Sequence, residues 1–338
     1  TEVSMSVTTR DEAASRRSFL KAASACSAAC LLRPSAAAAG EDAILRFGLI
    51  ADVHQDIMHD AIPRIRAFVA AMEEEKVDFV CHLGDLCWPH ERNLPFLNEW
   101  RTFTGPRYHT LGNHDMDGGF TREQTVAFYG MPHKHYSFDV KGVHFVVLDG
   151  NEPGGKRKGY KRHIAAEQRK WLAEDLAKTA LSTIVFSHQP LDTGSGIENC
   201  DAVRKILEKA TTEDGARKVV ACFCGHFHDD YMTTINGISY IRINSASNYW
   251  LGQPFQHESY SKEIHEKFPW ICNTAPYKDP LWAVVEVDLA KGNLTVKGRE
   301  TEWVGPSPWE VGADEKRIPR TRVAPKVSNR VIHLGAKG

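Results

Sequence analysis

The chain has no excess of charge of one sign, and this lack argues against one broad class of partner. Its 338 residues include 42 Lys and Arg against 43 Asp and Glu, for a formal net charge of −1. Proteins that bind nucleic acids usually carry a basic patch or stripe, which this balance does not supply. We therefore expect no nucleic-acid partner.

Cysteine pairs with the spacing of a zinc-thiolate site are also missing. Beyond residue 40 no Cys-x-x-Cys pair occurs among the cysteines, which are Cys81, Cys87, Cys200, Cys222, Cys224 and Cys272. This pattern disfavours a structural zinc site made of thiolates. Three of them lie in apolar runs and are expected to be buried free thiols, while a disulfide stays open.

A hydrophobic run long enough to span a membrane is missing too. The apolar stretch from Phe19 to Leu32 is too short for a spanning helix, and Lys21 interrupts it. It follows an arginine pair, Arg16 and Arg17, and precedes an alanine-rich segment. This order predicts a twin-arginine signal peptide over residues 1–40, cleaved near Ala39, and a periplasmic or secreted protein. A lipid anchor stays open, and the mature part is expected to have no transmembrane segment.

Short apolar runs, each ending in a polar cluster, predict strands buried on both faces. They cover residues 44–54, 78–85, 107–115, 143–149, 182–188 and 219–228. Apolar residues at helical spacing predict helices over 61–75, 165–177 and 200–210. Strands that alternate with helices indicate an α/β fold.

The later part of the chain has a different pattern. Residues 232–243, with Asn-Gly between two alternating runs, and residues 283–298 both predict hairpins that add antiparallel strands. We expect one folded domain over residues 41–300, and the motifs described below predict that it is catalytic. Residues 301–338 are rich in proline and charge, which predicts an extended C-terminal tail that wraps the domain or is partly disordered.

The polar clusters at the strand ends have the composition of a metal site. They contain seven candidate ligands: Asp52, His54, Asp85, Asn113, His188, His226 and His228. Open α/β sheets bind ligands at the carboxyl ends of their strands. Carboxylate, amide and imidazole donors suit manganese, iron or zinc. Seven donors exceed the needs of one tetrahedral ion, but with one bridging carboxylate they give four contacts to each of two ions.

The spacing within these clusters also has a physical reading. In extended backbone, residues i and i+2 point the same way, so Asp52 with His54, and His226 with His228, are expected to hold one ion together. Glycines at 84, 112 and 225 are expected to let the backbone turn sharply beside the ligands.

The ordered motifs Asp-x-His, Gly-Asp, Gly-Asn-His-Asp, a single His after an apolar strand and Gly-His-x-His resemble the calcineurin-like metallophosphoesterase family. The resemblance spans roughly residues 45–230. It implies a four-layer αββα sandwich, with two mixed sheets flanked by helices. It also implies two divalent or trivalent metal ions with Asp85 as the bridging ligand. The first ion would be held by Asp52, His54 and His228, and the second by Asn113, His188 and His226.

The resemblance further implies two catalytic residues that are not ligands. His114 would lie beside the scissile phosphoester and stabilise charge or protonate the leaving oxygen. Asp115, the next residue, is expected to orient that imidazole. The nucleophile would be hydroxide activated by the metals, so no serine or cysteine nucleophile is needed.

The substrate implied is a small phosphoester, with nucleotides among the candidates. The core is similar to class III cyclic-nucleotide phosphodiesterases and to manganese-dependent ADP-ribose and CDP-alcohol pyrophosphatases. A phosphodiesterase is expected, and a broad-specificity phosphomonoesterase or a nucleotide-diphosphate pyrophosphatase stays open. Purple acid phosphatases have a tyrosine ligand at the position of Trp88, so a purple ferric-tyrosinate enzyme is disfavoured. A non-catalytic protein of this fold should have lost ligands, and here all seven are present.

Three further features have two readings each. The basic loop 151–163 either draws an anionic substrate to the metals or is merely solvated. Asn248, Tyr249 and Trp250 either line the pocket or serve in packing. Asp56 and His82 either support the ligands or form local hydrogen bonds.

Overall fold

The computed structural model describes residues 44–334. The predicted twin-arginine signal over residues 1–40 lies outside this range. Within it, no helix is both long enough and apolar enough to cross a membrane. All six cysteines in this range are free, and five of them are buried.

The first sheet begins the fold and also receives the end of the chain. Its strand order is β14-β13-β12-β1-β2-β3. The pairs β1–β2 and β2–β3 are parallel, whereas the three remaining pairs are antiparallel. The strands are β1 (Leu45–Ile50), β2 (Phe79–His82), β3 (Arg107–His109), β12 (Ala283–Asp288), β13 (Asn293–Lys297) and β14 (Arg330–His333).

The second sheet is also mixed, with the order β4-β5-β6-β7-β9-β8. Its three central pairs, β5–β6, β6–β7 and β7–β9, are parallel, and its two edge pairs are antiparallel. The strands are β4 (Tyr136–Val140), β5 (Val143–Leu148), β6 (Ser182–Ser187), β7 (Val219–Cys224), β8 (Tyr231–Ile235) and β9 (Ile238–Arg242).

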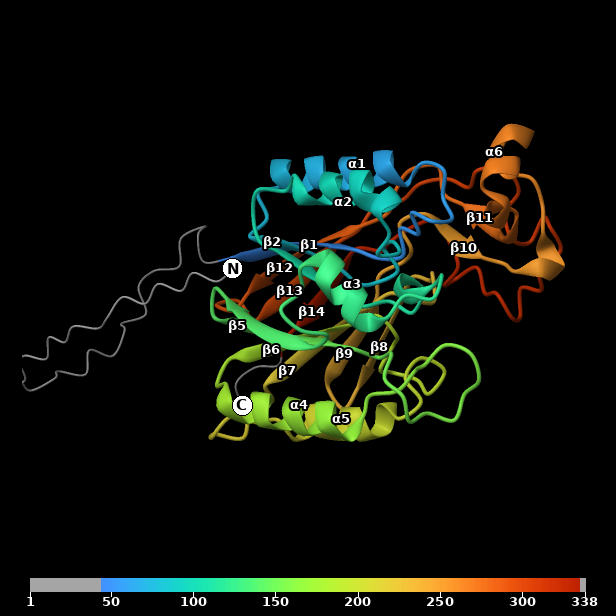
Figure 1. Ribbon diagram of the computed structural model, residues 1–338. Helices are drawn as coiled ribbons and strands as arrows, with labels where there is room; N and C mark the ends of the chain where they lie inside the picture. The colour runs from blue at the N-terminus through green and yellow to red at the C-terminus, as the bar shows by residue number, and fades with distance from the viewer. Residues whose placement is uncertain (1–43, 335–338) are drawn as a thin grey trace, which may run out of the picture. The chain divides into compact units, whose positions relative to one another are not determined.

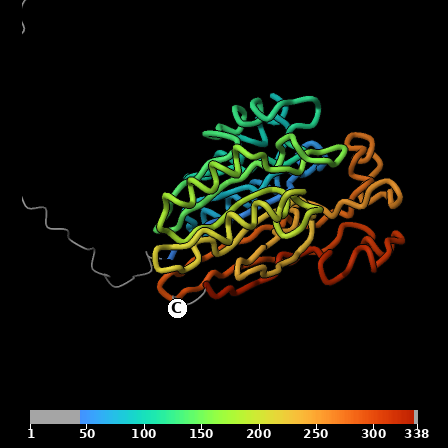
Figure 2. Tube along the Cα trace, turned by 90° about the horizontal axis from the view of Figure 1, so that it is seen from below, coloured from blue at the N-terminus to red at the C-terminus, as the bar shows by residue number. Residues whose placement is uncertain are grey.

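Helices cover the outer face of each sheet, so the molecule has four layers (Figure 1). The helices α1 (Ala61–Glu74) and α2 (Leu94–Arg101) pack over the first sheet. Over the second sheet lie α4 (Ala166–Lys178) and α5 (Cys200–Lys209), side by side in Figure 2. Helical spacing of apolar residues explains this cover, because it places Ile65, Phe68 and Met72 of α1 on the buried face.

Aromatic side chains fill the space between the two sheets. Phe47 of β1 stacks on Phe79 of β2 with ring centroids 4.9 Å apart. The same ring meets Phe145 of β5 at 5.5 Å and Phe186 of β6 at 5.9 Å, in edge-to-face contacts. All four rings are fully buried, so this cluster holds the sheets together and fixes the distance between their strand ends.

A smaller lobe lies beyond the ends of the sheets (Figure 1). It contains the two-stranded ribbon of β10 (Asn248–Trp250) and β11 (Thr274–Pro276), together with α6 (Lys262–Lys267). Between β3 and β4 lie a 3₁₀ turn, η3 (His114–Met116), and α3 (Arg122–Tyr129).

The expected αββα sandwich of two mixed sheets is confirmed, and both predicted hairpins form, as β8–β9 and β12–β13. The expected boundary at residue 300 does not separate two units. The described residues form a single compact unit, and β14 pairs with β13 at the edge of the first sheet. The last described segment therefore packs in the same unit as the two sheets.

Candidate metal centre

The seven predicted ligands follow strands of both sheets. Asp52 and His54 come after β1, Asp85 after β2 and Asn113 after β3. From the second sheet, His188 comes after β6, and the pair His226 and His228 after β7. Because these strands are parallel within each sheet, their carboxyl ends meet at one edge of the sandwich.

The first group of donors consists of Asp52, His54 and His228, all of them buried. The Nε2 atoms of the two histidines are 3.1 Å apart. Oδ1 of Asp52 lies 3.3 Å from Nε2 of His228 and 3.9 Å from Nε2 of His54. Three donor atoms thus face one point, which is the arrangement that a bound cation requires.

The second group contains Asp85, His188 and His226, with Asn113 beside them. Nε2 of His188 lies 3.1 Å from Oδ2 of Asp85, 3.2 Å from Nδ1 of His226 and 3.1 Å from Oδ1 of Asn113. Oδ2 of Asp85 is also 3.9 Å from Nε2 of His54 in the first group. Asp85 therefore lies between the two groups, where its carboxylate would be shared by two bound cations.

Hydrogen bonds to backbone carbonyls show that two histidines fit a cation. Nδ1 of His228 lies 2.8 Å from the carbonyl oxygen of Asn248, and Nδ1 of His188 lies 2.8 Å from that of Leu83. A carbonyl only accepts, so each Nδ1 carries a proton and donates it. In the neutral ring the lone pair is then on Nε2, which points into the centre.

The electrostatics of the centre also suit bound cations. Burial alone would raise the pKa of Asp85, but His188 and His114 outweigh burial and hold this pKa well below its usual range. Burial lowers the pKa of His54 to about 3, so its imidazole is neutral. Burial alone would lower the pKa of His188. The negative charge of Asp85 outweighs burial and raises the pKa of His188 to about 9. His188 must therefore release a proton when a cation binds.

The backbone that carries these ligands is not extended, contrary to the sequence prediction. Positive φ angles between 51° and 74° occur at Asp52, His54, Asp85, His226 and His228. These are five of the eight non-glycine residues with positive φ in the part of the chain that the structure describes. Left-handed backbone costs about 1–3 kcal/mol per residue and persists only where its surroundings hold it. The i and i+2 side chains converge through this strained turn rather than through strand alternation.

The glycines beside the ligands also act differently from the prediction. Only Gly84 has a positive φ, of 97°. At Gly112 a Cβ atom would lie 2.1 Å from the backbone nitrogen and Oδ1 of Asp85, and at Gly225 it would lie 2.4 Å from Oδ2 of Asp52. Gly112 and Gly225 are needed for close approach to the ligands, not for a turn.

His114 lies beside the centre, but Asp115 does not orient it as predicted. Nδ1 of His114 is 2.7 Å from Oδ2 of Asp117 and 3.0 Å from the hydroxyl of Tyr160. Burial lowers the pKa of His114, but Asp85 and Asp117 outweigh burial and raise it. The orienting carboxylate is therefore Asp117, because the 3₁₀ turn η3 directs the Asp115 side chain inward.

The carboxylate of Asp115 is fully buried and accepts hydrogen bonds from the loops around it. Its donors are the backbone N–H groups of Asp85, Leu86 and Gly112 and the hydroxyl of Tyr129, at 2.7–3.2 Å. These bonds tie the loop that carries Asp85 to the loop that carries Asn113. Asp115 thus holds two ligand loops together.

Comparison with known proteins agrees with this geometry. The family model for calcineurin-like phosphoesterases matches residues 45–230, more than half of the 338 residues. The chain belongs to the calcineurin-like phosphoesterase family. It is accordingly a metal-dependent phosphoric ester hydrolase, as the sequence motifs indicated.

Two curated relatives of this family member are manganese-dependent ADP-ribose/CDP-alcohol diphosphatases. The protein of Oryza sativa subsp. japonica is 25% identical over an alignment 262 residues long; the match covers 56% of this chain and 79% of the relative. The protein of Arabidopsis thaliana is 22% identical over an alignment 280 residues long; the match covers 62% of this chain and 88% of the relative. The match thus extends over most of the length of each relative.

Two solved structures share the fold of this phosphoesterase. A dimetal phosphatase from Danio rerio superposes with a TM-score of 0.56 at 17% identity, covering 78% of this chain and 99% of that one. The Plasmodium protein GAP50, the anchor in the inner membrane complex, superposes with a TM-score of 0.51 at 15% identity, covering 78% and 89%. At these identities the likeness concerns the fold alone.

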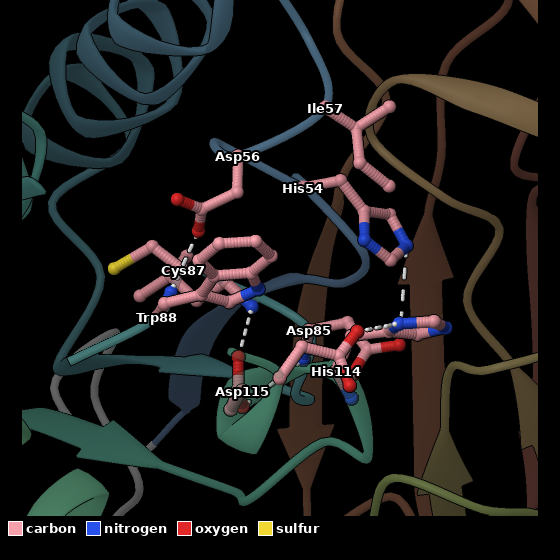
Figure 3. Close-up of a pocket in the computed structure, with 10 residues that line it drawn as sticks. His54, Asp56, Ile57, Asp85, Cys87, Trp88, His114 and Asp115 are labelled. Carbon is pink, nitrogen blue, oxygen red and sulfur yellow. Dashed lines mark hydrogen bonds and ion pairs between the residues drawn. The ribbon is translucent and has the colours of Figure 1, made fainter. Parts of the chain in front are cut away.

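A small pocket opens next to the metal centre of the phosphoesterase (Figure 3). It holds about 30 Å³ and is lined by His54, Asp85 and His114 together with Ile57 and Trp88. Trp88 occupies the sequence position at which the tyrosine ligand of a purple acid phosphatase was expected. It lines the pocket here and forms part of its apolar wall.

The structure shows the contacts of several residues whose roles the sequence left open. The Asp56 carboxylate accepts the backbone N–H of Trp88 at 2.7 Å and the side chain of Asn93 at 2.9 Å, so it fixes the wall of the pocket. His82 bonds to His109 at 2.7 Å and accepts the N–H of Gly84, which is local bonding. Asn248 supports His228, whereas Trp250 is 43% exposed on the ribbon.

Sequence reasoning missed Asp117 and Tyr160. Asp117 could have been predicted, because residues i and i+3 of a 3₁₀ turn lie on the same side, and Asp117 is three residues after His114. Tyr160 could not, since it lies 46 residues from His114 in an irregular loop.

Proposed function

We propose that this phosphoesterase hydrolyses a phosphorus–oxygen bond in a small diphosphate diester, a class that includes nucleoside-diphosphate sugars and alcohols. The observation that carries the catalytic part is the convergence of seven donor side chains from two sheets, with His114 beside them. The choice of a diphosphate over a simple phosphodiester rests on the basic loop 151–163 and on the names of the two curated relatives.

Two ions, with manganese as the first choice because of those relatives and iron or zinc next, would be held by the seven ligands named above. When bound, they supply Lewis-acid chemistry, lowering the pKa of water and neutralising phosphate oxygens. In the reaction, water adds across the P–O–P bridge. One P–O bond forms, another breaks, and two phosphate monoesters result.

His114 is the residue that acts on the leaving oxygen. Its Nδ1 is engaged by Asp117 and Tyr160, which leaves Nε2 for the substrate. Asp85 and Asp117 raise the pKa of His114 and so stabilise its imidazolium form. An imidazolium can donate a proton to the departing oxygen or stabilise its developing charge.

The basic loop supplies the argument for a second phosphate. Within the described residues, no ion pair forms with any of its cations, which are Lys156, Arg157, Lys158, Lys161 and Arg162. Tyr160, in the middle of these cations, hydrogen-bonds His114 and Asp117 at 3.0 Å, so the loop reaches the reaction site. The Arg162 charge is close enough to lower the pKa of His226, after burial and the effect of His188. The cations of a loop that reaches the reaction site favour a substrate with additional negative charge.

Paired substrates test this proposal. The manganese-loaded protein is assayed with ADP-ribose, which has two phosphorus atoms, and with bis(4-nitrophenyl) phosphate, which has one. In Arg157→Gln/Arg162→Gln we expect KM for ADP-ribose to rise roughly tenfold, since a charged contact to phosphate contributes about 1.5 kcal/mol. KM for the single-phosphate diester should change little.

The matched control removes the same two charges elsewhere. Lys170→Gln/Lys262→Gln changes exposed lysines of α4 and α6, and KM should not change for either substrate. Equal increases of KM for both substrates in the loop variant would contradict a second phosphate site. A folded, metal-loaded protein that hydrolyses no diphosphate, phosphodiester or phosphomonoester would contradict the catalytic proposal itself.

We also propose export by the twin-arginine route. Replacement of Arg16 and Arg17 by lysine should retain the protein in the cytoplasm, as measured by fractionation, whereas the native pair should deliver it to the periplasm or medium. Equal export of both forms would contradict this proposal.

A further inference from the structure

Two buried carboxylates follow directly after the ligand loop Gly225–His228. Asp229 and Asp230 are each 5% exposed, and neither belongs to the two groups of metal donors. An ionised carboxylate is costly to bury unless charged or polar groups surround it. The partners of this pair come from two places, β9 and the segment Pro319–Arg330, which we call the C-terminal strap.

Asp229 joins the strap to β9. Its Oδ2 accepts Nε of Arg322 at 3.0 Å, and the NH2 group of Arg322 also bonds to it. Arg242, at the end of β9, donates from NH1 to the same oxygen at 3.1 Å and from NH2 to Asp192 at 2.6 Å. Two arginines therefore share one buried carboxylate next to the ligand loop.

The Arg242 guanidinium also contacts the ligand loop directly. It lies over the ring of Phe227 at 4.7 Å and over the ring of Tyr231 at 4.6 Å. Phe227 is the residue between the two ligand histidines. The Arg322 guanidinium lies over the same Tyr231 ring, at 4.3 Å from its centroid. The ring of Phe227 is thus fixed by an arginine whose own position depends on Asp229.

Asp230 forms a second connection to the strap. Its carboxylate accepts the Ser328 hydroxyl at 2.5 Å, the Ser328 backbone N–H at 3.2 Å and NH2 of Arg330 at 2.6 Å. Its own backbone N–H donates to the carbonyl oxygen of Arg322 at 2.8 Å. Both the side chain and the backbone of Asp230, two residues after His228, are therefore hydrogen-bonded to the strap.

We propose that the C-terminal strap positions the metal centre, with Arg322 and Arg330 as positioning residues that act through Asp229 and Asp230. His226 and His228 have φ angles of 74° and 51°, a conformation that reverts unless it is held. One of these histidines belongs to each donor group. Loosening the strap therefore weakens both metal sites, from a segment that contacts neither of them.

The test measures metal affinity, not turnover. Wild type and the variants Arg322→Gln and Arg330→Gln are titrated with Mn²⁺ by calorimetry, and bound metal is counted by elemental analysis after dialysis. We expect dissociation constants 10–100-fold higher in the variants, the range for groups that orient a metal ligand. Arg330→Lys, which keeps the charge, should restore part of the affinity. This expectation depends on the metal centre and not on the proposed substrate.

The control is Arg320→Gln in the same strap. Arg320 lies over Trp309 at 4.0 Å and pairs with Glu315, and neither residue touches the ligand loop. The Arg320→Gln variant should bind Mn²⁺ with the affinity of wild type. If Arg322→Gln does not fold, Ser328→Ala, which removes one hydroxyl bond to Asp230, decides the question. Unchanged affinity in a folded strap variant, even with a lower melting temperature, would overturn the proposal. A wild type that binds no metal would instead contradict the centre itself.

Discussion

Asp115 and Asp117 lie two residues apart, and the structure assigns them different roles. Asp117 contacts Nδ1 of His114 at 2.7 Å and is partly exposed, with a side-chain exposure of 29%. Asp115 is fully buried and bonds to backbone N–H groups of two ligand loops. The first is a group that a reaction can use, and the second is part of the framework.

Asp117→Asn should therefore lower kcat by at least roughly tenfold, with KM and bound metal unchanged. The amide still fills the space but no longer favours the imidazolium of His114, and complete loss of an acid–base group costs 10²–10⁴-fold. Steady-state kinetics with metal analysis of the same sample measures this effect.

Asp115→Asn is the comparison. It loses an acceptor for buried backbone donors, and the free energy of unfolding should fall by about 3 kcal/mol. Denaturant unfolding measures this loss. A normal kcat in Asp117→Asn combined with a large loss in a fully folded Asp115→Asn would restore the role first predicted for Asp115.

The ligand positions were readable from the sequence because polar residues directly follow apolar runs. The way they converge was not. The five positive φ angles at the ligands depend on contacts such as the backbone N–H of Asp52 to the carbonyl of Gly84 at 3.0 Å and that of His54 to Asp85 at 3.0 Å. These contacts join separate strands, and no local pattern encodes them.

At the scale of elements, the end of β3 must approach the end of β2 closely. Gly112→Ala should greatly reduce metal binding, since a Cβ atom would stand 2.1 Å from Oδ1 of Asp85 and displace the carboxylate between the two groups. Elemental analysis of the dialysed protein should give well below two ions per chain.

Gly119→Ala is the matched control for this change. Gly119 has nothing within 4 Å of its added Cβ, so this variant should keep its metal and lose only the stability that a positive φ costs. Full metal content in a folded Gly112→Ala would show that the close approach is not needed.

A buried histidine, remote from the metals, joins the β4–β5 hairpin to α4. His144 of β5 contacts Asp139 of β4 at 2.5 Å and Asp175 of α4 at 2.9 Å. Burial lowers the pKa of His144, but the bonds to Asp175 and Asp139 outweigh burial and raise it. Burial raises the pKa of Asp175, but its bonds to His144 and Ser137 outweigh burial and lower it. The folded state therefore favours the charged pair.

This pair makes stability depend on pH. A raised histidine pKa contributes fully below the unfolded value near 6.5 and is lost as pH rises through the folded value. Wild type should therefore exceed His144→Gln in free energy of unfolding by up to about 1 kcal/mol at pH 6, and by less at pH 9. Urea unfolding at both pH values measures this difference, and an equal difference at both would contradict the assignment.

Strands and helices with strong periodicity were predictable, and short ones were not. The runs before residue 230 all became strands of the two sheets, and the Asn-Gly pair closed the hairpin at Asn236, which has a φ of 49°. By contrast, α2 and α3 have eight residues each, too few for a clear apolar face. β10 and β11 have three residues each and depend on pairing with one another.

At the scale of the whole molecule, composition predicted the last segment to be an extended tail that wraps the domain or is partly disordered. Its order comes from distant partners, because β14 pairs with β13 and Arg322 reaches Asp229, 93 residues away. A charged, proline-rich sequence gives no sign of such contacts. The segment folds because the domain offers buried carboxylates and a free strand edge.

The metal centre joins the two sheets, because each donor group takes ligands from both. The first combines Asp52 and His54 after β1 with His228 after β7, and the second combines Asp85 after β2 with His188 and His226. Bound cations therefore oppose separation of the sheets. At 100 times the dissociation constant each site adds about 2.7 kcal/mol to the free energy of unfolding, so two sites should raise the melting temperature by on the order of 10 °C.

Calorimetric melting with Mn²⁺, and then with excess chelator, measures this shift. Asp85→Asn is the control, because it removes the carboxylate between the groups and should melt at nearly the same temperature with and without Mn²⁺. If manganese, iron and zinc all leave the wild-type melting temperature unchanged, the sheets are not joined by cations. The donors would then be held together by the polar contacts within each group, such as His54 with His228 and Asn113 with His188. If instead wild type responds and Asp85→Asn does not, the shared carboxylate is what couples the two halves of the fold.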